Sequence, residues 1–207
     1  AIDSWIGQLG SLAEKYNVSV ISAVGIDKRD KPGVKIRVVD DKLKEIIVYY
    51  NSSKFKILNL IRFFTSYMVG YTFYRKKYGK PELIHANILT RVGFIAYLLS
   101  KFYGIKYVVS EHWSRYYKEN LSYKSWIRKY LTNKVASKAE YIIVPSERLQ
   151  NAMIEQKIRG SYVVVPNVVD TDLFTIASDK AGNKTKQFVH ISCFEDKSKN
   201  ISMLFKA

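Results

Sequence analysis

Two histidines stand where apolar runs of the sequence end. His85 closes the run in "ELIHAN" (82–87), and His112 follows the run in "YVVSEHW" (107–113). Imidazole changes its protonation state near neutral pH and can exchange hydrogen bonds with a hydroxyl group, so it can act as a general acid, a general base or a binding group. A core strand ordinarily ends in small or turn-forming residues. Imidazoles at two such positions therefore mark candidate site residues.

The segments that carry these positions alternate between two periodicities. β-branched apolar runs indicate buried strands, and amphipathic stretches indicate helices. The predicted strands cover 18–24, 34–40, 45–50, 81–86, 105–110, 140–145 and 161–166, and the predicted helices cover 4–17, 54–79, 89–104, 123–139 and 146–156. Gly104 is expected to end one helix and Ser146 to cap another. This order predicts an α/β fold, a doubly wound parallel sheet with helices on both faces, in which ligands bind at the carboxyl ends of the strands.

The chain divides by composition into a main domain and a short remainder. Residues 175–186 are polar and rich in turn formers, which indicates a linker. Residues 1–174 form the predicted α/β domain, which we expect to lack its first strand because the sequence opens on a helix. Residues 187–207 are expected to form the first strand and helix of a truncated second domain.

Composition limits the class of protein. The 207-residue chain is 47% hydrophobic and 25% charged, so it can bury a core as a globular unit. Its one cysteine excludes an internal disulfide and indicates a reducing, cytoplasmic compartment, and three dispersed histidines argue against a metal cage. No apolar stretch approaches the ~18 residues that a membrane span needs, and no signal-peptide pattern opens the sequence.

The formal net charge of +16 is concentrated in two segments. Residues 46–81 and 113–138 each carry seven basic side chains, against no acid in the first segment and one in the second. Such segments attract nucleic acid, an anionic membrane surface or a phosphorylated substrate. The first segment also contains Phe55, Leu58, Ile61 and Phe64, which suit an interfacial helix or pack in the core. A nucleic-acid-binding module is therefore an alternative, although no recognised nucleic-acid motif is present.

Four stretches together resemble the N-terminal half of the family 4 glycosyltransferases, enzymes of the GT-B fold. "ELIHAN" is similar to the family's strand ending in His-x-His, and "YVVSEHW" to the strand whose exit holds a His in the acceptor domain. "IIVPSERLQNAM" resembles the strand, Ser and helix that follow, and "VVVPNVVDTDLF" the Pro-Asn-Gly-Val-Asp-x-x-x-Phe signature. "FVHISCFEDKSKNISMLFKA" resembles the opening of the donor domain. The resemblance implies a Rossmann-like, acceptor-side domain.

The sequence departs from the family pattern at several positions. Asn87 replaces the second His of His-x-His, and Val168 replaces the usual Gly. Cys193 stands where the family often has an Arg that contacts the donor diphosphate, whereas Lys199 is in place for the second basic contact. The paired carboxylates of the family's donor domain have no counterpart in these 207 residues.

The resemblance implies a role for each candidate residue. His112 is the implied catalytic residue, which would hold an acceptor hydroxyl near the anomeric carbon. The acceptor would also contact His85, Asn87, Glu111 and Trp113, and the donor would contact Asn167 and Lys199.

Each of these residues also has a structural alternative. Either histidine could bond a neighbouring carbonyl or cap a turn, and Glu111 could pair with Arg115. Asn167 could hold a loop through its amide, and Lys199 could be an ordinary exposed lysine. Trp113, Tyr116 and Tyr117 could stack on a sugar ring, or they could pack under the following helix.

The implied reaction is transfer of a sugar from a nucleotide-sugar donor to a glycan or lipid-linked acceptor, as in polysaccharide biosynthesis. The family implies retention of the anomeric configuration, with no metal and no other cofactor. We expect an enzyme that is peripheral on the inner face of the cytoplasmic membrane and that binds no nucleic acid. We expect the 207-residue chain alone to be inactive, because most of the donor site is missing. A non-catalytic partner subunit with this fold is a further alternative.

Overall fold

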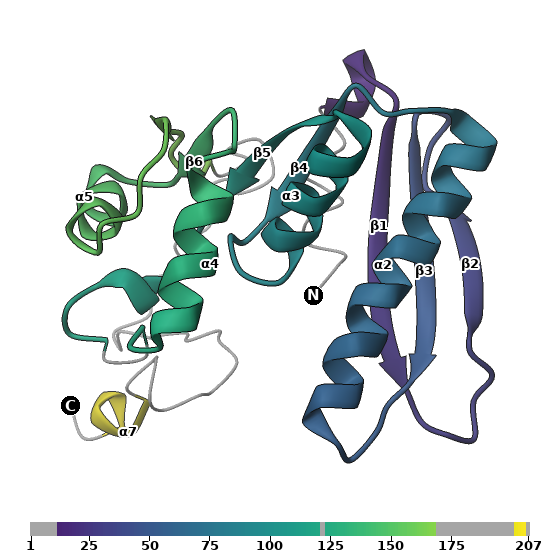
Figure 1. Ribbon diagram of the computed structural model, residues 1–207, viewed down its shortest axis with the longest axis horizontal. Coiled ribbons are helices and arrows are strands. Elements are labelled where there is room, and N and C mark those ends of the chain that lie inside the picture. The colour runs from purple at the N-terminus through teal and green to yellow at the C-terminus, as the bar shows by residue number, and fades with distance from the viewer. Residues whose placement is uncertain (1–11, 121–122, 169–200, 206–207) are drawn as a thin grey trace, which may run out of the picture. The chain divides into compact units, whose positions relative to one another are not determined.

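The computed structural model describes residues 12–120, 123–168 and 201–205 (Figure 1). The chain divides into two compact units, Ala1–Asn167 and Val168–Ala207. In the second unit the described part includes the short helix α7 (Ile201–Leu204), which lies within the predicted final helix. The predicted linker 175–186 and the predicted strand at 187–192 lie outside the described residues, so the domain boundaries stay a prediction.

A three-stranded sheet forms the N-terminal part of the first unit. Strand β1 (Val18–Ile26) pairs in parallel with β3 (Leu43–Asn51), and β2 (Gly33–Val38) pairs antiparallel with β3, which gives the order β1-β3-β2. The antiparallel pair follows from the chain, because the short connection from β2 to β3 is far below the dozen or so residues that a parallel crossover needs. Most of β2 is exposed, as expected of an edge strand.

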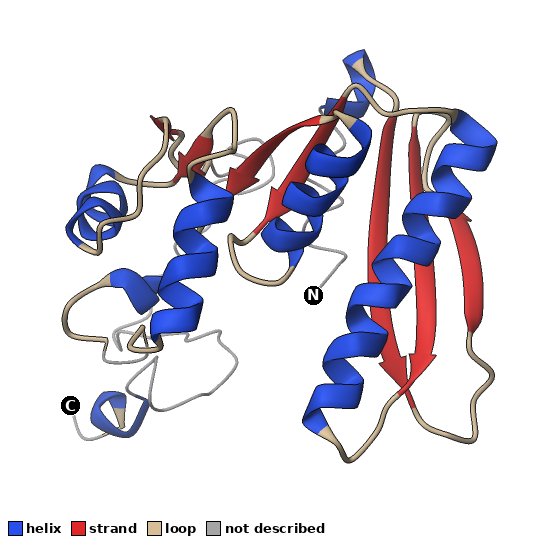
Figure 2. Cartoon of the chain, viewed as in Figure 1, coloured by secondary structure: helices blue, strands red, loops and turns tan. Residues whose placement is uncertain are grey.

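A second sheet contains the strands that carry the candidate residues. Strands β4 (Leu83–Asn87), β5 (Lys106–Ser110), β6 (Ile142–Val144) and β7 (Tyr162–Val164) are all parallel and lie in the order β4-β5-β6-β7 (Figure 2). The predicted α/β class with a parallel sheet flanked by helices is confirmed. The hydrogen bonding differs in one respect from a single continuous sheet, because within the described residues β1 and β4 belong to separate sheets.

Three helices follow strands of this sheet and pack on it. They are α3 (Val92–Tyr103), α4 (Trp126–Ala136) and α5 (Glu147–Glu155). One buried cluster joins them to alternate strand residues, and it includes Ala86, Ala96, Tyr107, Val109, Val135, Ile142, Val144 and Met153. On β4, Leu83 and His85 are exposed, whereas Ala86 is buried. Because side chains alternate across a strand, His85 lies on the face opposite the helix-covered one.

Helix α2 (Lys56–Tyr78) packs on the first sheet and against α3. It contacts the sheet at the buried Gly70, where an added Cβ would lie 2.7 Å from a methyl carbon of Ile21. From Phe63 onward its side chains join a second cluster around Tyr71, Ile95 and Leu99. The first two turns of α2 do not pack in the core as one of the two sequence-based interpretations expected, because Phe55, Leu58 and Ile61 are exposed.

The two predicted helix ends are confirmed. Gly104 ends α3 in the left-handed conformation at φ 61°, where glycine carries no Cβ penalty. Ser146 caps α5, and its hydroxyl accepts a hydrogen bond from the Leu149 N–H at 3.3 Å. The cap fixes the chain direction at the exit of β6.

Candidate active site

The parallel pairing of the second sheet brings the predicted site residues of β4 and β5 together at the carboxyl ends of these strands. We call this end of the sheet the β4–β5 edge. Asn87 at the end of β4 pairs with Ser110 at the end of β5, and Ser110 pairs with Ile143 of β6. The Ile88 N–H donates to the Ser110 carbonyl at 2.7 Å, and the Glu111 N–H donates to the Ile143 carbonyl at 2.9 Å. The exits of three strands are therefore tied together by backbone hydrogen bonds.

His85 connects β4 to β5 through its side chain. Its Nε2 lies 2.7 Å from the Ser110 hydroxyl oxygen, so the two side chains share a hydrogen bond. Although His85 keeps solvent-accessible surface, the surrounding protein atoms lower its pKa from the ordinary 6.5, and the charge of His112 lowers it further. The charge of His112 therefore acts on His85 at this edge, and His85 favours its neutral form at neutral pH.

Asn87 presents an unpartnered acceptor beside these imidazoles. Its side-chain Oδ1 is buried and has no hydrogen-bond partner among the residues that the structure describes. A buried polar atom without a partner costs about 1–3 kcal/mol, so it marks a position where a ligand donor would be stabilising. A hydroxyl group is one such donor.

The Glu111 carboxylate is the best-satisfied group at the edge. It is 0% exposed and accepts four hydrogen bonds. Oε1 accepts from the N–H groups of His112 and Trp113, each at 3.0 Å. Oε2 accepts from the Leu89 N–H at 3.1 Å and from the Tyr116 hydroxyl at 2.9 Å. The two oxygens of a carboxylate offer about four lone-pair positions, so its capacity is filled.

This arrangement corrects the expectation that the Glu111 side chain is exposed to substrate. Burial of an ionised carboxylate is tolerated here because backbone and hydroxyl donors replace the water that it loses. Burial also raises the pKa of Tyr116 far above its usual value, and the charge of Glu111 adds to that rise. Tyr116 is itself 0% exposed, so it packs in the core and offers no stacking surface.

The loop after β4 contains two residues in the left-handed region. Ile88 has φ 80° and Arg91 has φ 41°, and neither is a glycine. Such conformations cost on the order of 1–3 kcal/mol each and persist where neighbouring contacts hold them. Glu111 holds this loop through the Leu89 N–H, and the Ile88 carbonyl accepts from the Gly93 N–H at 3.0 Å. Sequence reasoning missed the loop, because a β-branched residue gives no signal of a positive φ.

Trp113 lies at the rim of the edge, and its side chain stacks on Arg115. The Arg115 guanidinium carbon lies 3.4 Å from the centroid of the Trp113 ring, and Trp113 is 38% exposed. Burial lowers the pKa of Arg115, while the charges of Tyr116 and Glu111 raise it. The guanidinium covers one face of the indole.

Of the two candidate donor-binding residues, Asn167 is among the described residues and Lys199 is not. Asn167 follows β7 and is exposed, and the Val165 N–H just before it donates to the Val144 carbonyl at 2.9 Å. Lys199 and Cys193 lie outside the described residues. In the described part of the chain, no group of three or more His, Cys, Asp or Glu side chains could hold a metal ion.

His85, His112 and Trp113 are exposed at this edge, whereas Glu111 and Ser110 are buried. A surface depression lined by Lys129, Tyr130 and Gln156 lies beside the end of α5 rather than at this edge. A reaction that must exclude water would need further protein or substrate to cover residues such as His85 and His112. Across the ranges that the structure covers, no helix is long and apolar enough to cross a membrane.

Comparisons with known proteins agree with this fold. The profile of Glycosyltransferase Family 4 matches residues 11–173. A solved structure of sucrose-phosphate synthase from Thermosynechococcus elongatus superposes with a TM-score of 0.62 at 15% identity, over 84% of this chain and 44% of that chain. A shorter structure of the same synthase gives a TM-score of 0.57 at 17% identity, over 82% of this chain and 87% of that chain. No curated protein matches in sequence.

The two kinds of comparison support different statements. The structural neighbours share the fold at low identity, and the chain spans 44% of the length of the larger one. The family match spans most of the chain, including the four strand exits described above. The chain belongs to glycosyltransferase family 4.

Proposed function

We propose that this chain forms the acceptor-side half of an enzyme that transfers a sugar from a nucleotide-sugar donor to a glycan or lipid-linked acceptor. The family match over residues 11–173 supports glycosyl transfer in general. The observation that carries the acceptor assignment is the sheet edge at which His85, His112 and the unpartnered Oδ1 of Asn87 come together.

Glycosyl transfer places definite demands on such an edge. The bond from the anomeric carbon to the donor diphosphate breaks, and the acceptor oxygen bonds to that carbon. When the acceptor attacks from the face that the diphosphate leaves, the configuration is retained and the acceptor proton passes to the leaving phosphate oxygen. The protein must orient the acceptor hydroxyl and stabilise the developing charge. Exposed His112 would touch the hydroxyl, and His85 and Asn87 would hold neighbouring hydroxyls of the same acceptor.

Glu111 has a positioning role in this proposal. Its carboxylate fixes the backbone of His112 and Trp113 on one side and the strained loop at Leu89 on the other. It thereby sets the distance between the β5 exit, which carries His112, and the loop that follows Asn87. Trp113, backed by Arg115, would offer its remaining face to a sugar ring.

The finer assignments follow from the family resemblance. Asn167 and Lys199 would contact the donor, and the reaction would use no metal. Retention of configuration, a role in polysaccharide biosynthesis and association with the inner face of the cytoplasmic membrane belong to the same proposal. The basic segments 46–81 and 113–138 support the membrane association.

A substrate panel tests this function. The full-length protein is incubated with a set of nucleotide sugars and with glycan or lipid-linked acceptors, and release of nucleoside diphosphate is measured together with the glycosylated product. We expect release that depends on both substrates for at least one pair. Specific binding of nucleic acid with no transfer to any acceptor would contradict the proposal and favour the nucleic-acid-binding alternative.

A further inference from the structure

The first two turns of α2 carry large apolar side chains that face solvent. Phe55 is 75% exposed, Ile57 76% and Ile61 53%, and Leu58 and Leu60 are also exposed. Lys54 and Lys56 flank them and are exposed as well. We refer to residues 54–61 as the α2 tip. Contiguous apolar surface of this kind on a folded domain ordinarily marks a contact with another body.

The apolar residues in the helical part of the α2 tip occupy one side of the helix, and Phe55 precedes them at the N-cap position. At about 100° per residue, Ile57, Leu58, Leu60 and Ile61 fall within an arc of roughly 160°. The inward side is different in kind. The Asn59 side chain accepts from the Ser53 N–H at 2.7 Å and donates to the Ser53 carbonyl, so it anchors the start of the helix. The apolar stripe of the α2 tip is therefore turned to solvent, on the same side of the helix that farther along carries Phe64 and Met68.

The exposure of this stripe ends where α2 meets α3. From Phe63 onward, the side chains of α2 pack with Ile95 and Leu99 of α3. The α2 tip precedes that contact, so within the described part of the first unit nothing covers it. Its exposure follows from the length of α2 relative to its packing partners.

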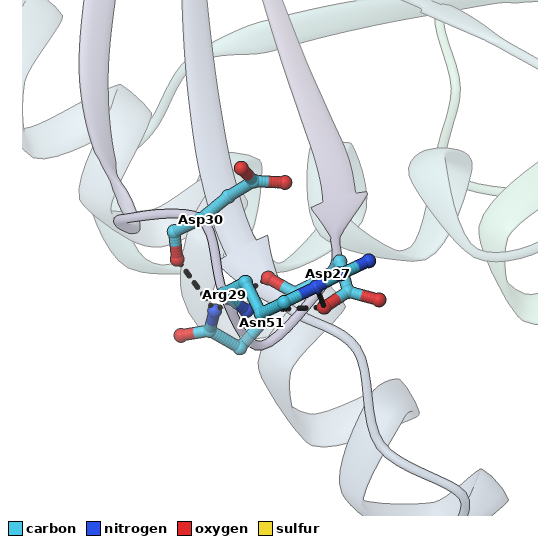
Figure 3. A network of polar contacts seen from close by, with 4 residues as sticks. All are labelled: Asp27, Arg29, Asp30 and Asn51. Atoms are coloured by element: carbon cyan, nitrogen blue, oxygen red, sulfur yellow. Dashed lines mark hydrogen bonds and ion pairs between the residues drawn. The ribbon is translucent and has the colours of Figure 1, made fainter.

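A charged turn is joined to the segment that leads into the α2 tip. The Asn51 side-chain amide donates to the carbonyl oxygens of Asp27 and Asp30 at 3.1 and 3.0 Å, and Arg29 pairs with the Asp27 carboxylate at 3.2 Å (Figure 3). The Ser52 N–H donates to the Ile26 carbonyl at 2.8 Å. These bonds join the turn after β1 to the segment that leads into α2.

The charges of this turn and of the α2 tip are mostly positive. The turn and the α2 tip together contain five cationic side chains, Lys28, Arg29, Lys31, Lys54 and Lys56, against the two carboxylates of Asp27 and Asp30. Apolar side chains surrounded by lysine and arginine match the layered chemistry of a membrane surface, with acyl chains below and anionic headgroups above. A nucleic acid would leave the isoleucine and leucine side chains in water.

We propose that the α2 tip inserts into the interfacial layer of an anionic bilayer, with Phe55, Ile57 and Ile61 as the inserting side chains and the neighbouring cations on the headgroups. This proposal rests on the proposed function, because it names the surface through which the proposed membrane association would occur. Because vesicle binding is measured without donor or acceptor sugar, failure of this proposal leaves the transferase proposal intact.

Vesicle co-sedimentation of the whole chain tests the insertion. The probes are vesicles of phosphatidylcholine alone and of phosphatidylcholine mixed with phosphatidylglycerol, at low and high salt. The test variant combines Phe55→Ser with Ile57→Ser. The matched control combines Phe102→Ser with Val38→Ser, which removes two side chains of similar exposure, 69% and 65%, outside the α2 tip. A third variant combines Lys54→Gln with Lys56→Gln.

We expect the wild-type chain to bind the anionic vesicles and not phosphatidylcholine alone. The apolar variant should lose roughly tenfold or more in affinity because two large side chains no longer leave water. The lysine variant should lose several-fold, which high salt should mimic. The control variant should bind within about twofold of wild type, because exposed single residues need no partner.

Three outcomes would overturn the insertion. Wild-type chain that does not bind anionic vesicles lacks the proposed partner. An apolar variant that binds like wild type would reduce the contact to charge alone. A concentration-dependent dimer that the apolar variant abolishes, measured by light scattering, would assign the α2 tip to a second copy of the chain.

Discussion

At the scale of single residues, the Glu111 carboxylate is buried at the end of β5, directly before the candidate site residue His112. Four donors surround it, and three of them are backbone N–H groups of Leu89, His112 and Trp113. Charge-assisted hydrogen bonds of this kind are about twice as strong as neutral ones. Glu111 therefore joins stability to site geometry.

Replacing Glu111 by glutamine tests that role. Glu111→Gln exchanges one acceptor oxygen for an NH₂ group, which would face a donor and leave two buried donors unsatisfied. We expect the free energy of unfolding to fall by about 2–4 kcal/mol. Glu140→Gln is the control, since Glu140 forms only an exposed pair with Lys106 at 3.7 Å and should change stability by less than about 0.5 kcal/mol. Equal stability of both variants in urea titrations would contradict the role of Glu111.

The lowered pKa of His85 makes a prediction about pH. Desolvation by the surrounding protein atoms and the charge of His112 hold the pKa of His85 below 6.5, so between the folded and unfolded values the unfolded chain binds more protons than the folded chain. Stability therefore rises with pH in that window, and it falls as the pH drops below about 6.5. His85→Gln should remove part of this fall in urea titrations at successive pH values. A variant with the wild-type pH dependence would show that His85 is not the group responsible.

The coupling between the two histidines can be measured directly. His112→Gln removes a positive charge near His85, so the pKa of His85 should rise toward 6.5. The measurement is an NMR titration of the His85 ring protons in wild type and variant. An unchanged midpoint would mean that the imidazoles do not share the edge as described.

At the scale of elements, the cap of α5 fixes the exit of β6. Ser146 and Ser125 both occupy N-cap positions, but only the Ser146 side chain caps its helix, through the Leu149 N–H. Ser146→Ala should therefore lower the free energy of unfolding by about 1 kcal/mol, and Ser125→Ala by much less. Thermal melts of the two variants give the comparison. The account of the cap fails if Ser125→Ala is the more harmful substitution.

The sequence predicts those parts of the fold that depend on local patterns. Strand and helix periodicities give the elements, the caps at Gly104 and Ser146 and the meeting of His85 with His112 at one edge. The burial of Glu111 was not predictable, because it depends on donors from Leu89 and Tyr116 that meet only after β4 and β5 pair. The exposure of Ile57 likewise depends on where the contact of α2 with α3 begins, which the periodicity of the sequence does not show.

At the scale of the whole molecule, the candidate residues of the proposed site divide between the two units of the chain. The candidate acceptor residues lie on the first unit, and the expected donor contact at Lys199 lies in the other unit. The larger structural neighbour is matched over 44% of its length. The family resemblance places paired carboxylates in the donor domain, and these 207 residues contain no counterpart of them.

The 207-residue chain by itself should therefore show no turnover. We expect no release of nucleoside diphosphate above the uncatalysed rate with any nucleotide sugar, even with acceptor present, because the donor would lack most of its binding groups. Measurable turnover by this chain alone would contradict the division of the site between two domains.

The most direct test of the central claim, that the β4–β5 edge binds the acceptor, is the rate of glycosyl transfer by the full-length protein carrying His112→Ala. Because His112 is exposed, the variant should keep the wild-type melting temperature. We predict that kcat/KM for the acceptor falls by about 100-fold or more, as expected for loss of a group that contacts the reacting hydroxyl. Near wild-type transfer by the folded variant would contradict the claim.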